Sequence, residues 1–320
     1  MKWKLRKFYL PGHIFRQMKN DSPSSTANIV ARNIAIVAAT EETSLVVSPE
    51  TARLNSLLIK TFSPSGERFI KRASHRWFQK LFHVFSLLTI RGLALHQALR
   101  KLHIENAVRQ SLTENFRQVV ILGGGLDTLS LRLCRAFPLV NFIEIDHPAT
   151  QKVKLKAIKD QKLETENLHF LAADFTKQDL AEILNLSSNY DPQSRTVFIC
   201  EGVLMYLKTE EVGEIFDFIK HQKADATRFI FTFMKPDKNG KINFRRSTFL
   251  VRLWLRWKNE PFKWGMKNKN LERFLAHKGF LIRELTTAET FRQKYLKKFG
   301  LENHSFAEGE NICICETKSK

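Results

Sequence analysis

The fold is decided by the stretch VVILGGG at residues 119–125, a short and continuous apolar run that ends in three glycines. Such a run is typical of a buried parallel strand, because helices cover both faces of that kind of strand. A helical pattern over 127–137 and a second apolar run over 140–146 follow it. This succession predicts the first strand, helix and strand of a parallel sheet.

The same alternation continues along the rest of the sequence. Strand-like runs recur at 168–172, 196–200, 228–234, after Gly279 and near 312–315, with helical patterns at 150–161, 180–184, 210–220 and 270–277. Strands that alternate with helices predict a mainly parallel sheet with helices on both faces. We therefore expect an α/β protein of Rossmann-like architecture, with a first third that is mostly helical.

Composition divides the sequence into three parts. Residues 1–25 form a basic arm, residues 26–115 a helical region, and residues 116–320 the α/β core, with an insertion at about 240–265. Two explanations of the arm stay open, attachment to an anionic surface and a loosely docked tail.

The charge balance is strongly basic. Lys and Arg number 52 against 32 Asp and Glu, which gives a formal net charge of +20. A surplus of this size attracts polyanions such as nucleic acid, anionic lipid or acidic metabolites, and a bias of the whole proteome would produce it as well. The four cysteines are too few and too scattered for a disulfide framework. We expect a reducing, cytoplasmic setting.

No segment has the composition of a membrane span or a signal peptide. The most apolar candidate, residues 77–102, is interrupted by Lys80, His83, Arg91, His96 and Arg100. It is expected to be an amphipathic helix that packs on the protein.

Glycines and acids follow the predicted strands at the ends where the ligand of such a sheet binds. The first strand ends in Gly123-Gly124-Gly125, the second in Glu144 and Asp146, the third before Asp174 and the fourth before Glu201. Each acid alone is explained equally well as a helix N-cap. Four strand ends in step indicate one shared ligand site.

The pattern favours an adenosine-containing ligand. The glycine turn has neither the G-x-G-x-x-G spacing of a dinucleotide site nor the Gly-Lys-Ser/Thr of a P-loop. An acid at the end of the next strand is placed to accept both hydroxyls of a ribose. Glu144 and Asp146 share a face of their strand, so one is expected to bind and the other to support it. Asp174 is a candidate acceptor for an adenine amine, with Phe175 against the ring.

These motifs resemble the leucine carboxyl methyltransferase family of class I S-adenosylmethionine enzymes. The resemblance rests on LGGGLDT (122–128), EIDHP (144–148), AAD (172–174), EGVLMYL (201–207) and EPFKWG (260–265). It implies a seven-stranded sheet whose last strand is antiparallel, a bound S-adenosylmethionine, and a helical region that covers the cofactor site. The sequence departs from the family at RGLALH (91–96), where the family often has Arg-Thr-Arg followed by an acid.

The resemblance also implies a role for individual residues. Arg91 is similar to the arginine that grips the methionine carboxylate, a task that suits a planar, permanently charged fork. Its alternative is a solvated arginine on an amphipathic helix. For the cofactor, the resemblance implies that Gly123 and Gly125 lie beside it, Asp146 binds the ribose, and Asp174 and Phe175 contact the adenine. It also implies that Glu201 lies near the methionine amino group and Tyr206 near the acceptor. Tyr206 is equally well explained as a core tyrosine.

We expect the reaction to be O-methylation of a carboxylate or hydroxyl on a small molecule, with Tyr206 and Arg91 as the catalytic candidates. A carboxylate is ionised at neutral pH and needs no general base. A hydroxyl would need one, for which His96, His147 and Tyr206 are the candidates. The insertion mixes aromatic residues with cations, which fits an acidic aromatic substrate or an amphipathic lid.

Two other functions stay open. The charge would also suit a methyltransferase that acts on tRNA or on a protein C-terminus, and a non-catalytic binding protein could retain the fold. We expect no metal, because the sequence lacks a set of ligands with metal-site spacing. The sequence identifies neither the acceptor nor the oligomeric state.

Overall fold

Seven strands form one sheet in the computed structural model, which describes residues 22–175, 178–245, 247–248 and 262–317. The order is β3-β2-β1-β4-β5-β7-β6. The strands are β1 (Gln118–Leu122), β2 (Asn141–Asp146), β3 (Leu168–Ala172), β4 (Thr196–Cys200), β5 (Thr227–Met234), β6 (Phe280–Thr286) and β7 (Glu310–Thr317). Neighbouring pairs from β3 to β5 are parallel, whereas β7 lies antiparallel between β5 and β6. The predicted α/β fold and its antiparallel last strand are confirmed.

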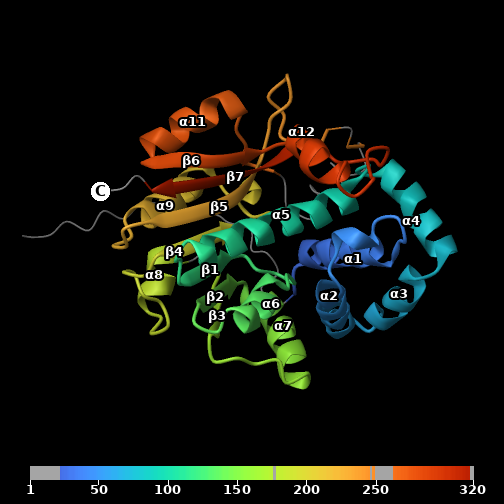
Figure 1. Ribbon diagram of the computed structural model, residues 1–320, viewed down its shortest axis with the longest axis horizontal. Coiled ribbons are helices and arrows are strands. Elements are labelled where there is room, and N and C mark those ends of the chain that lie inside the picture. Colours follow the sequence, from blue (N-terminus) through green and yellow to red (C-terminus); the bar gives the residue numbers. More distant parts are fainter. Residues whose placement is uncertain (1–21, 176–177, 246, 249–261, 318–320) are drawn as a thin grey trace, which may run out of the picture.

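Helices flank the sheet and extend beyond it (Figure 1). Five precede it, α1 (Ser25–Ala39), α2 (Pro49–Phe62), α3 (Gly66–Ala73), α4 (Arg76–Leu88) and α5 (Leu93–Thr113). Within the described residues the later helices are α6 (Leu129–Ala136), α7 (Pro148–Asp160), α8 (Leu180–Asn185), α9 (Thr209–Lys220), α11 (Asn268–His277) and α12 (Ala288–Phe291). Short turns complete the set, η1 (Ser44–Val46), η2 (Leu204–Tyr206) and the π-helical η3 (Arg292–Leu296).

Two hydrophobic layers lie on opposite faces of the sheet. Side chains alternate along each strand, so that Val119 and Ile121 of β1 face one layer while Val120 and Leu122 face the other. The first layer is completed by α1, α5, α6 and α12, and the second by α8, α9 and α11. Burial on both faces explains why the strands are continuous apolar runs in the sequence.

Local sequence signals set the helix boundaries near the ends of the strands. The Ser24 hydroxyl accepts a hydrogen bond from the amide of Ala27 (3.1 Å) and so begins α1. After β2, His147 caps α7 and Pro148 occupies its first position. These caps fix the path of the chain where it leaves the sheet.

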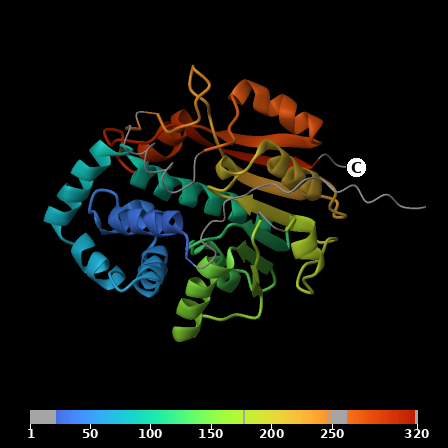
Figure 2. The ribbon, with the colours of Figure 1, turned by 180° about the vertical axis from the view of Figure 1, so that it is seen from behind.

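The segment 77–102 differs from its prediction. It is not one packed helix, because Gly92, at a φ of +76°, ends the preceding turn and lets α5 begin in a new direction. A Cβ on Gly92 would lie only 2.3 Å from the Ser305 carbonyl oxygen, so glycine is required there. The helix before this break, α4, has no buried residue. Figures 1 and 2 show α3 and α4 at the outer edge of the molecule.

Parts of two predicted regions lie outside the described residues. The structure describes only 22–25 of the predicted basic arm and leaves out 246 and 249–261 of the predicted insertion. Within the described part, no helix combines the length and apolar character that a membrane crossing requires.

Candidate cofactor-binding edge

Four parallel strands end side by side and bring the predicted ligand residues to one edge of the sheet. The pairing registers place the ends of β2 and β3 together, and the amide of Ala173 donates to the Asp146 carbonyl (2.9 Å). The ends of β1 and β4 adjoin them in the same register. We call this place the strand-end edge. It consists of the glycine turn (123–125), Asp146, Asp174 and Glu201.

The glycine turn at the end of β1 has no room for side chains. Gly123 adopts a φ of +73°, and a Cβ on it would lie 2.5 Å from Cγ2 of Val203. A Cβ on Gly124 would lie 2.4 Å from Cδ of Glu144. The turn therefore presents bare backbone at the edge, as a site for a close-fitting ligand requires.

Asp146 holds the glycine turn from the end of β2. One carboxylate oxygen accepts a hydrogen bond from the amide of Gly125, and the other accepts from the amide of His147 (2.5 Å). The side chain is 8% exposed, and this burial raises the pKa of the carboxyl against the opposing effect of the two amides. Asp146 thus reaches the edge with part of its surface still accessible.

Glu144, two residues earlier on the same strand, lies beneath the turn. Its carboxylate pairs with the ammonium of Lys154 and accepts a hydrogen bond from the Ser130 hydroxyl (2.7 Å). The residue is only 1% exposed, and burial raises the pKa of its carboxyl although Lys154 opposes the shift. The two acids of β2 therefore have different surroundings, with Asp146 at the edge and Glu144 inside the protein.

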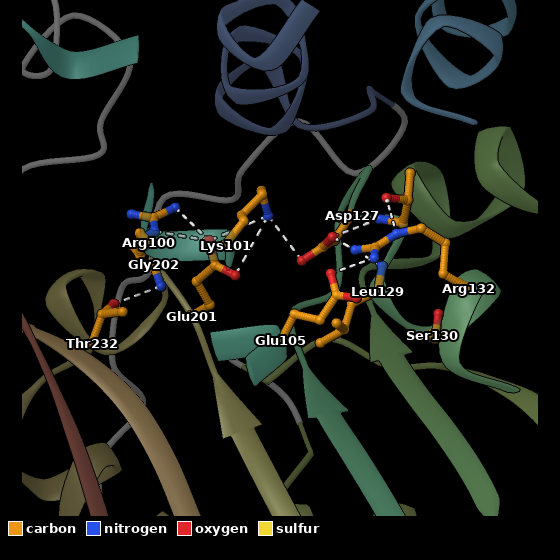
Figure 3. Close-up of polar contacts among 12 residues, drawn as sticks. Arg100, Lys101, Glu105, Asp127, Leu129, Ser130, Arg132, Glu201, Gly202 and Thr232 are labelled. Atoms are coloured by element: carbon orange, nitrogen blue, oxygen red, sulfur yellow. Dashed lines mark hydrogen bonds and ion pairs between the residues drawn. The ribbon is translucent and has the colours of Figure 1, made fainter. Parts of the chain in front are cut away.

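Helix α5 supplies two cations that sequence reasoning did not assign to the site. We call Arg100, Lys101, Asp127, Glu201 and Glu310 the α5 charge cluster. Arg100 Nη1 donates to both oxygens of Glu310 (2.9 and 2.7 Å), and its Nε and Nη2 both lie 2.8 Å from Oε1 of Glu201. Lys101 Nζ lies 2.8 Å from Asp127 and 3.2 Å from Glu201, as Figure 3 shows. One helix thus links the tips of β1 and β4.

The electrostatics of this cluster favour charged side chains in spite of burial. Burial alone would lower the pKa of the Arg100 guanidinium, but Glu310 and Glu201 raise it above its ordinary value. Burial likewise acts to raise the pKa of Glu310, while Arg100 beside it lowers that pKa to about 2. Lys101 holds the pKa of Asp127 well below its ordinary range, again against the effect of burial. The shifts in the pKa of Arg100, Glu310 and Asp127 therefore all favour the charged form.

His96 is a further partner of Glu310. Its Nε2 is 2.8 Å from a Glu310 oxygen, and its ring packs 5.1 Å from that of Phe306. Among the described residues its buried Nδ1 has no hydrogen-bond partner. The other histidine candidate, His147, uses its ring to cap α7. His96 is buried against Glu310 and offers no exposed ring nitrogen to an acceptor, whereas His147 is half-buried.

Arg91 and Tyr206 lie at a different end of the site. Arg91 is exposed in the turn before α5, where its Nε donates to the Ser305 hydroxyl (2.6 Å). Leu93 and Arg100 are seven residues apart on α5, roughly 10 Å along the helix axis. Tyr206 lies in η2 with its ring 5.6 Å from that of Phe262. These contacts do not bring Arg91 into the charge cluster.

The remaining predicted residues follow β3. The carbonyl of Asp174 accepts a hydrogen bond from the amide of Gln178 (3.1 Å), and Phe175 packs against the second hydrophobic layer. Asp174 is therefore at the strand-end edge, with Phe175 directly behind it. Their assignment to an adenine ring stays a prediction.

Helix α1 crosses over the glycine turn. A Cβ on Gly125 would lie 3.2 Å from Cβ of Ala27, and the amide of Ser24 donates to the Thr150 hydroxyl (2.9 Å). The next residue, Asn28, has a buried side-chain oxygen without a hydrogen-bond partner in the described part of the chain. A buried acceptor without a partner, one residue from the contact with the glycine turn, is a suitable place for a ligand hydroxyl or amine.

Comparison with known proteins relates this edge to a family. The sequence model described as leucine carboxyl methyltransferase matches residues 52–220, more than half of the chain. YktD of Bacillus subtilis, whose name assigns it provisionally to the S-adenosyl-L-methionine-dependent methyltransferases, is 28% identical over 194 residues, 58% of this chain and 60% of its own. Rv3399 of Mycobacterium tuberculosis, which carries the same provisional name, is 32% identical over 132 residues, 41% of this chain and 37% of its own.

The sequence matches therefore span less than two thirds of the length of these relatives.

Solved structures show the same fold. A protein from Thermobifida fusca, provisionally named a methyltransferase, superposes with a TM-score of 0.55 at 15% identity over 83% of this chain and 94% of its own. A DUF574 family protein from Streptomyces avermitilis gives 0.53 at 12% identity over 93% and 98%. With more than half of its length matched by the family's sequence model, the chain belongs to the leucine carboxyl methyltransferase family.

Proposed function

We propose that the protein binds S-adenosylmethionine at the strand-end edge and transfers its methyl group to an oxygen of a small acceptor. The family membership and the names of its relatives support this activity. The observation that carries the proposal is the convergence of bare glycine backbone, an edge carboxylate and a buried ion-paired arginine at one edge of a Rossmann-like sheet. Ligands of such sheets bind at this place.

The residues present fit the adenosine half of the donor. Asp146 is the proposed partner of the ribose hydroxyls, with the backbone of Gly123 and Gly125 close to the sugar. Asp174 and Phe175 are the proposed contacts of the adenine ring. The unfilled oxygen of Asn28 offers one further acceptor on the side that α1 covers. Glu144 has the supporting role, since it fixes the turn from beneath.

The methionine half of the donor carries an ammonium and a carboxylate, and the α5 charge cluster offers a partner for each. Glu201 is the proposed acceptor for the ammonium. Arg100 and Lys101 are the proposed cations for the carboxylate, because both already lie within 3.2 Å of Glu201. We therefore transfer to Arg100 the role that the sequence comparison gave to Arg91. Placing opposite charges side by side suits a zwitterion.

The acceptor is proposed to bind near Tyr206. Tyr206 packs there against a small apolar cluster, which consists of Ile90, Met205, Met234, Phe244 and Ala307. Arg91 follows Ile90 directly and is exposed. An acceptor with an apolar body and a carboxylate would match this combination.

Alignment is the main task of the protein in this reaction. The sulfonium makes the methyl group reactive when the donor is bound, so the chain's own residues have to hold the acceptor oxygen in line with it. Positioning of this kind supplies about 7–11 kcal/mol in well-oriented reactions. Tyr206 is the proposed residue that orients the acceptor oxygen, and Arg91 the one that attracts an acceptor carboxylate.

The decisive experiment is calorimetric titration with S-adenosylmethionine. We expect binding by the wild-type protein, and a loss of affinity of at least about tenfold (1.4 kcal/mol) in Asp146→Asn and in Lys101→Met. Arg91→Met is the matched control, since it removes a cation of the same region outside the cluster. Circular dichroism would verify that each variant is folded.

Three results would contradict the proposal. Absence of binding by the wild-type protein would favour a non-catalytic member that retains the fold. Unchanged affinity in Asp146→Asn would refute the ribose assignment. A loss confined to Arg91→Met would restore the original assignment of the methionine carboxylate. The acceptor itself can be identified by a mass search of cell extract for molecules that gain one methylene unit with enzyme and donor.

A further inference from the structure

Helix α4 presents its apolar side to solvent. Its large exposed residues are Trp77, Leu81, Val84, Phe85, Leu87 and Leu88, each between 43% and 59% exposed. Residues 77, 81, 84, 85 and 88 follow helical spacing and form one continuous stripe. A stripe of this kind normally faces a core, so its exposure marks an interaction surface.

The side of α4 that faces the protein carries Phe78, Gln79, Phe82 and Ser86, which are half-buried. Gln79 donates from Nε2 to the carbonyls of Ala39 (3.0 Å) and Ala73 (2.9 Å), which attaches the helix to the body. Phe78 packs edge-on against Phe69 of α3, with ring centroids 5.7 Å apart. These contacts hold α4 in the orientation that turns its apolar stripe outwards.

Cations lie beside the N-terminal end of the apolar stripe, on α3 and the first two turns of α4. Arg68, Lys71, Arg72, Arg76 and Lys80 are all exposed on α3 and α4. Glu67 is the one acid in the sequence of residues 66–88, and it pairs with Lys71 (3.1 Å). Arg76 has a second acid within reach, Glu41 of the loop after α1 (3.3 Å). The surface keeps a positive surplus after both pairs are counted.

We propose that α3 and α4 form a docking surface for an anionic lipid bilayer. The apolar stripe would enter the boundary between headgroups and acyl chains, with Trp77, Leu81, Val84, Phe85 and Leu88 as the inserted side chains. The flanking cations would contact lipid phosphates. A helix with basic residues beside a Trp, Phe and Leu face is typical of one that lies in the membrane interface. With 13 residues, α4 is suited to lie on a bilayer and too short to cross it.

Position and charge favour a bilayer over other occupants. Both ribbon views place α3 and α4 at the rim of the molecule, so that a flat surface can approach them (Figures 1 and 2). A second copy of the chain would place its own five cations against the five cations of this surface. The two longest sequence segments outside the described residues are also basic, with six cations against one acid in 1–21 and three against one in 249–261. Like charges oppose each of these contacts.

The test is co-sedimentation with vesicles of phosphatidylcholine, with and without phosphatidylserine. We expect binding only to vesicles that contain phosphatidylserine, weakened by salt because exposed charges are screened. The double variant Leu81→Ser with Phe85→Ser should lose binding. Arg76→Gln with Lys80→Gln should lower affinity about 25-fold, since each surface cation contributes about fivefold.

The matched control is the double variant Leu139→Ser with Leu186→Ser. Both leucines are more than 80% exposed and lie outside α3 and α4, so this variant should bind the vesicles as the wild type does. Equal binding by the α4 apolar variant, or binding that ignores phosphatidylserine, would overturn the proposal. A dimer in sedimentation velocity that the α4 variant abolishes would assign the surface to a second copy instead.

Discussion

Helices α4 and α5 are consecutive in the chain, yet they place their side chains in opposite ways. α5 buries twelve of its 21 residues, including the charged Arg100, whereas α4 buries none of its 13 and exposes Trp77 and Phe85. The difference follows from what each helix finds beside it. The strand ends below α5 supply acids for its cations and a sheet for its apolar residues, and α4 meets the body on one narrow side. Burial therefore depends on partners as well as on side-chain polarity.

Removal of the buried cation of α5 should have the largest effect. Arg100→Met removes the buried guanidinium that pairs with both Glu310 and Glu201, and breaking a buried ion pair in this way typically costs about 3–5 kcal/mol of unfolding free energy. Arg76→Met on α4 is the matched control, because its ion pair with Glu41 is exposed and contributes about 0–1 kcal/mol. Urea unfolding followed by circular dichroism measures both. Equal losses in the two variants would contradict the contrast between the helices.

A buried apolar residue of α5 should come next. Leu99 is fully buried between the helical region and the sheet. Leu99→Ala removes its contacts and leaves a cavity, at a cost of about 2–5 kcal/mol. The same urea titration reports this loss, and a cost below about 1 kcal/mol would mean that α5 is less tightly packed than the structure shows.

Glu310 should control how the free energy of unfolding changes with pH in the acid range. The pKa of Glu310 is about 2 in the folded protein against an ordinary 4.5, so its contribution is complete above pH 4.5 and is lost as pH falls towards 2. In Glu310→Gln the fall of unfolding free energy over that window should be shallower, by roughly 1–3 kcal/mol. Urea titrations at several pH values test this. Parallel wild-type and variant curves would show that the Arg100–Glu310 pair contributes nothing.

The smallest effect is expected on the exposed stripe of α4. Leu81→Ala should change the unfolding free energy by no more than about 0.5 kcal/mol, because the side chain is 57% exposed. Set beside Leu99→Ala, the same chemical change on the next helix, this variant isolates burial as the cause. A loss as large as that of Leu99→Ala would mean that α4 packs against other protein.

The strand-end part of the site could be predicted from sequence. Strand periodicity locates the strand ends, and parallel strands share an edge, so the sequence predicts that Gly123, Asp146, Asp174 and Glu201 lie along one edge of the sheet. The same reasoning gave the order of strands and helices. This reasoning uses local sequence patterns alone, and the folded structure keeps the elements that those patterns predict.

Arg100 and Lys101 could not be found in this way. A helix pattern does not reveal which side of α5 faces the strand ends, and the family comparison pointed to Arg91, one turn of loop before the helix. One signal was present: α5 leads directly into β1 and must pack on the sheet, so cations in its middle need acids nearby. The exposed face of α4 was missed for a related reason, since an amphipathic pattern does not show which side meets the protein.

The cluster also imposes an order on the making of this protein. Glu310 lies 210 residues after Arg100 and belongs to β7, which is inserted between β5 and β6. A nascent chain exposes α5 and the first five strands to the cell well before that strand has been synthesised. Until then Arg100 lacks one of its two acids and the sheet lacks its seventh strand. The α5 charge cluster therefore cannot be completed until residue 310 has been synthesised and β7 has paired between β5 and β6.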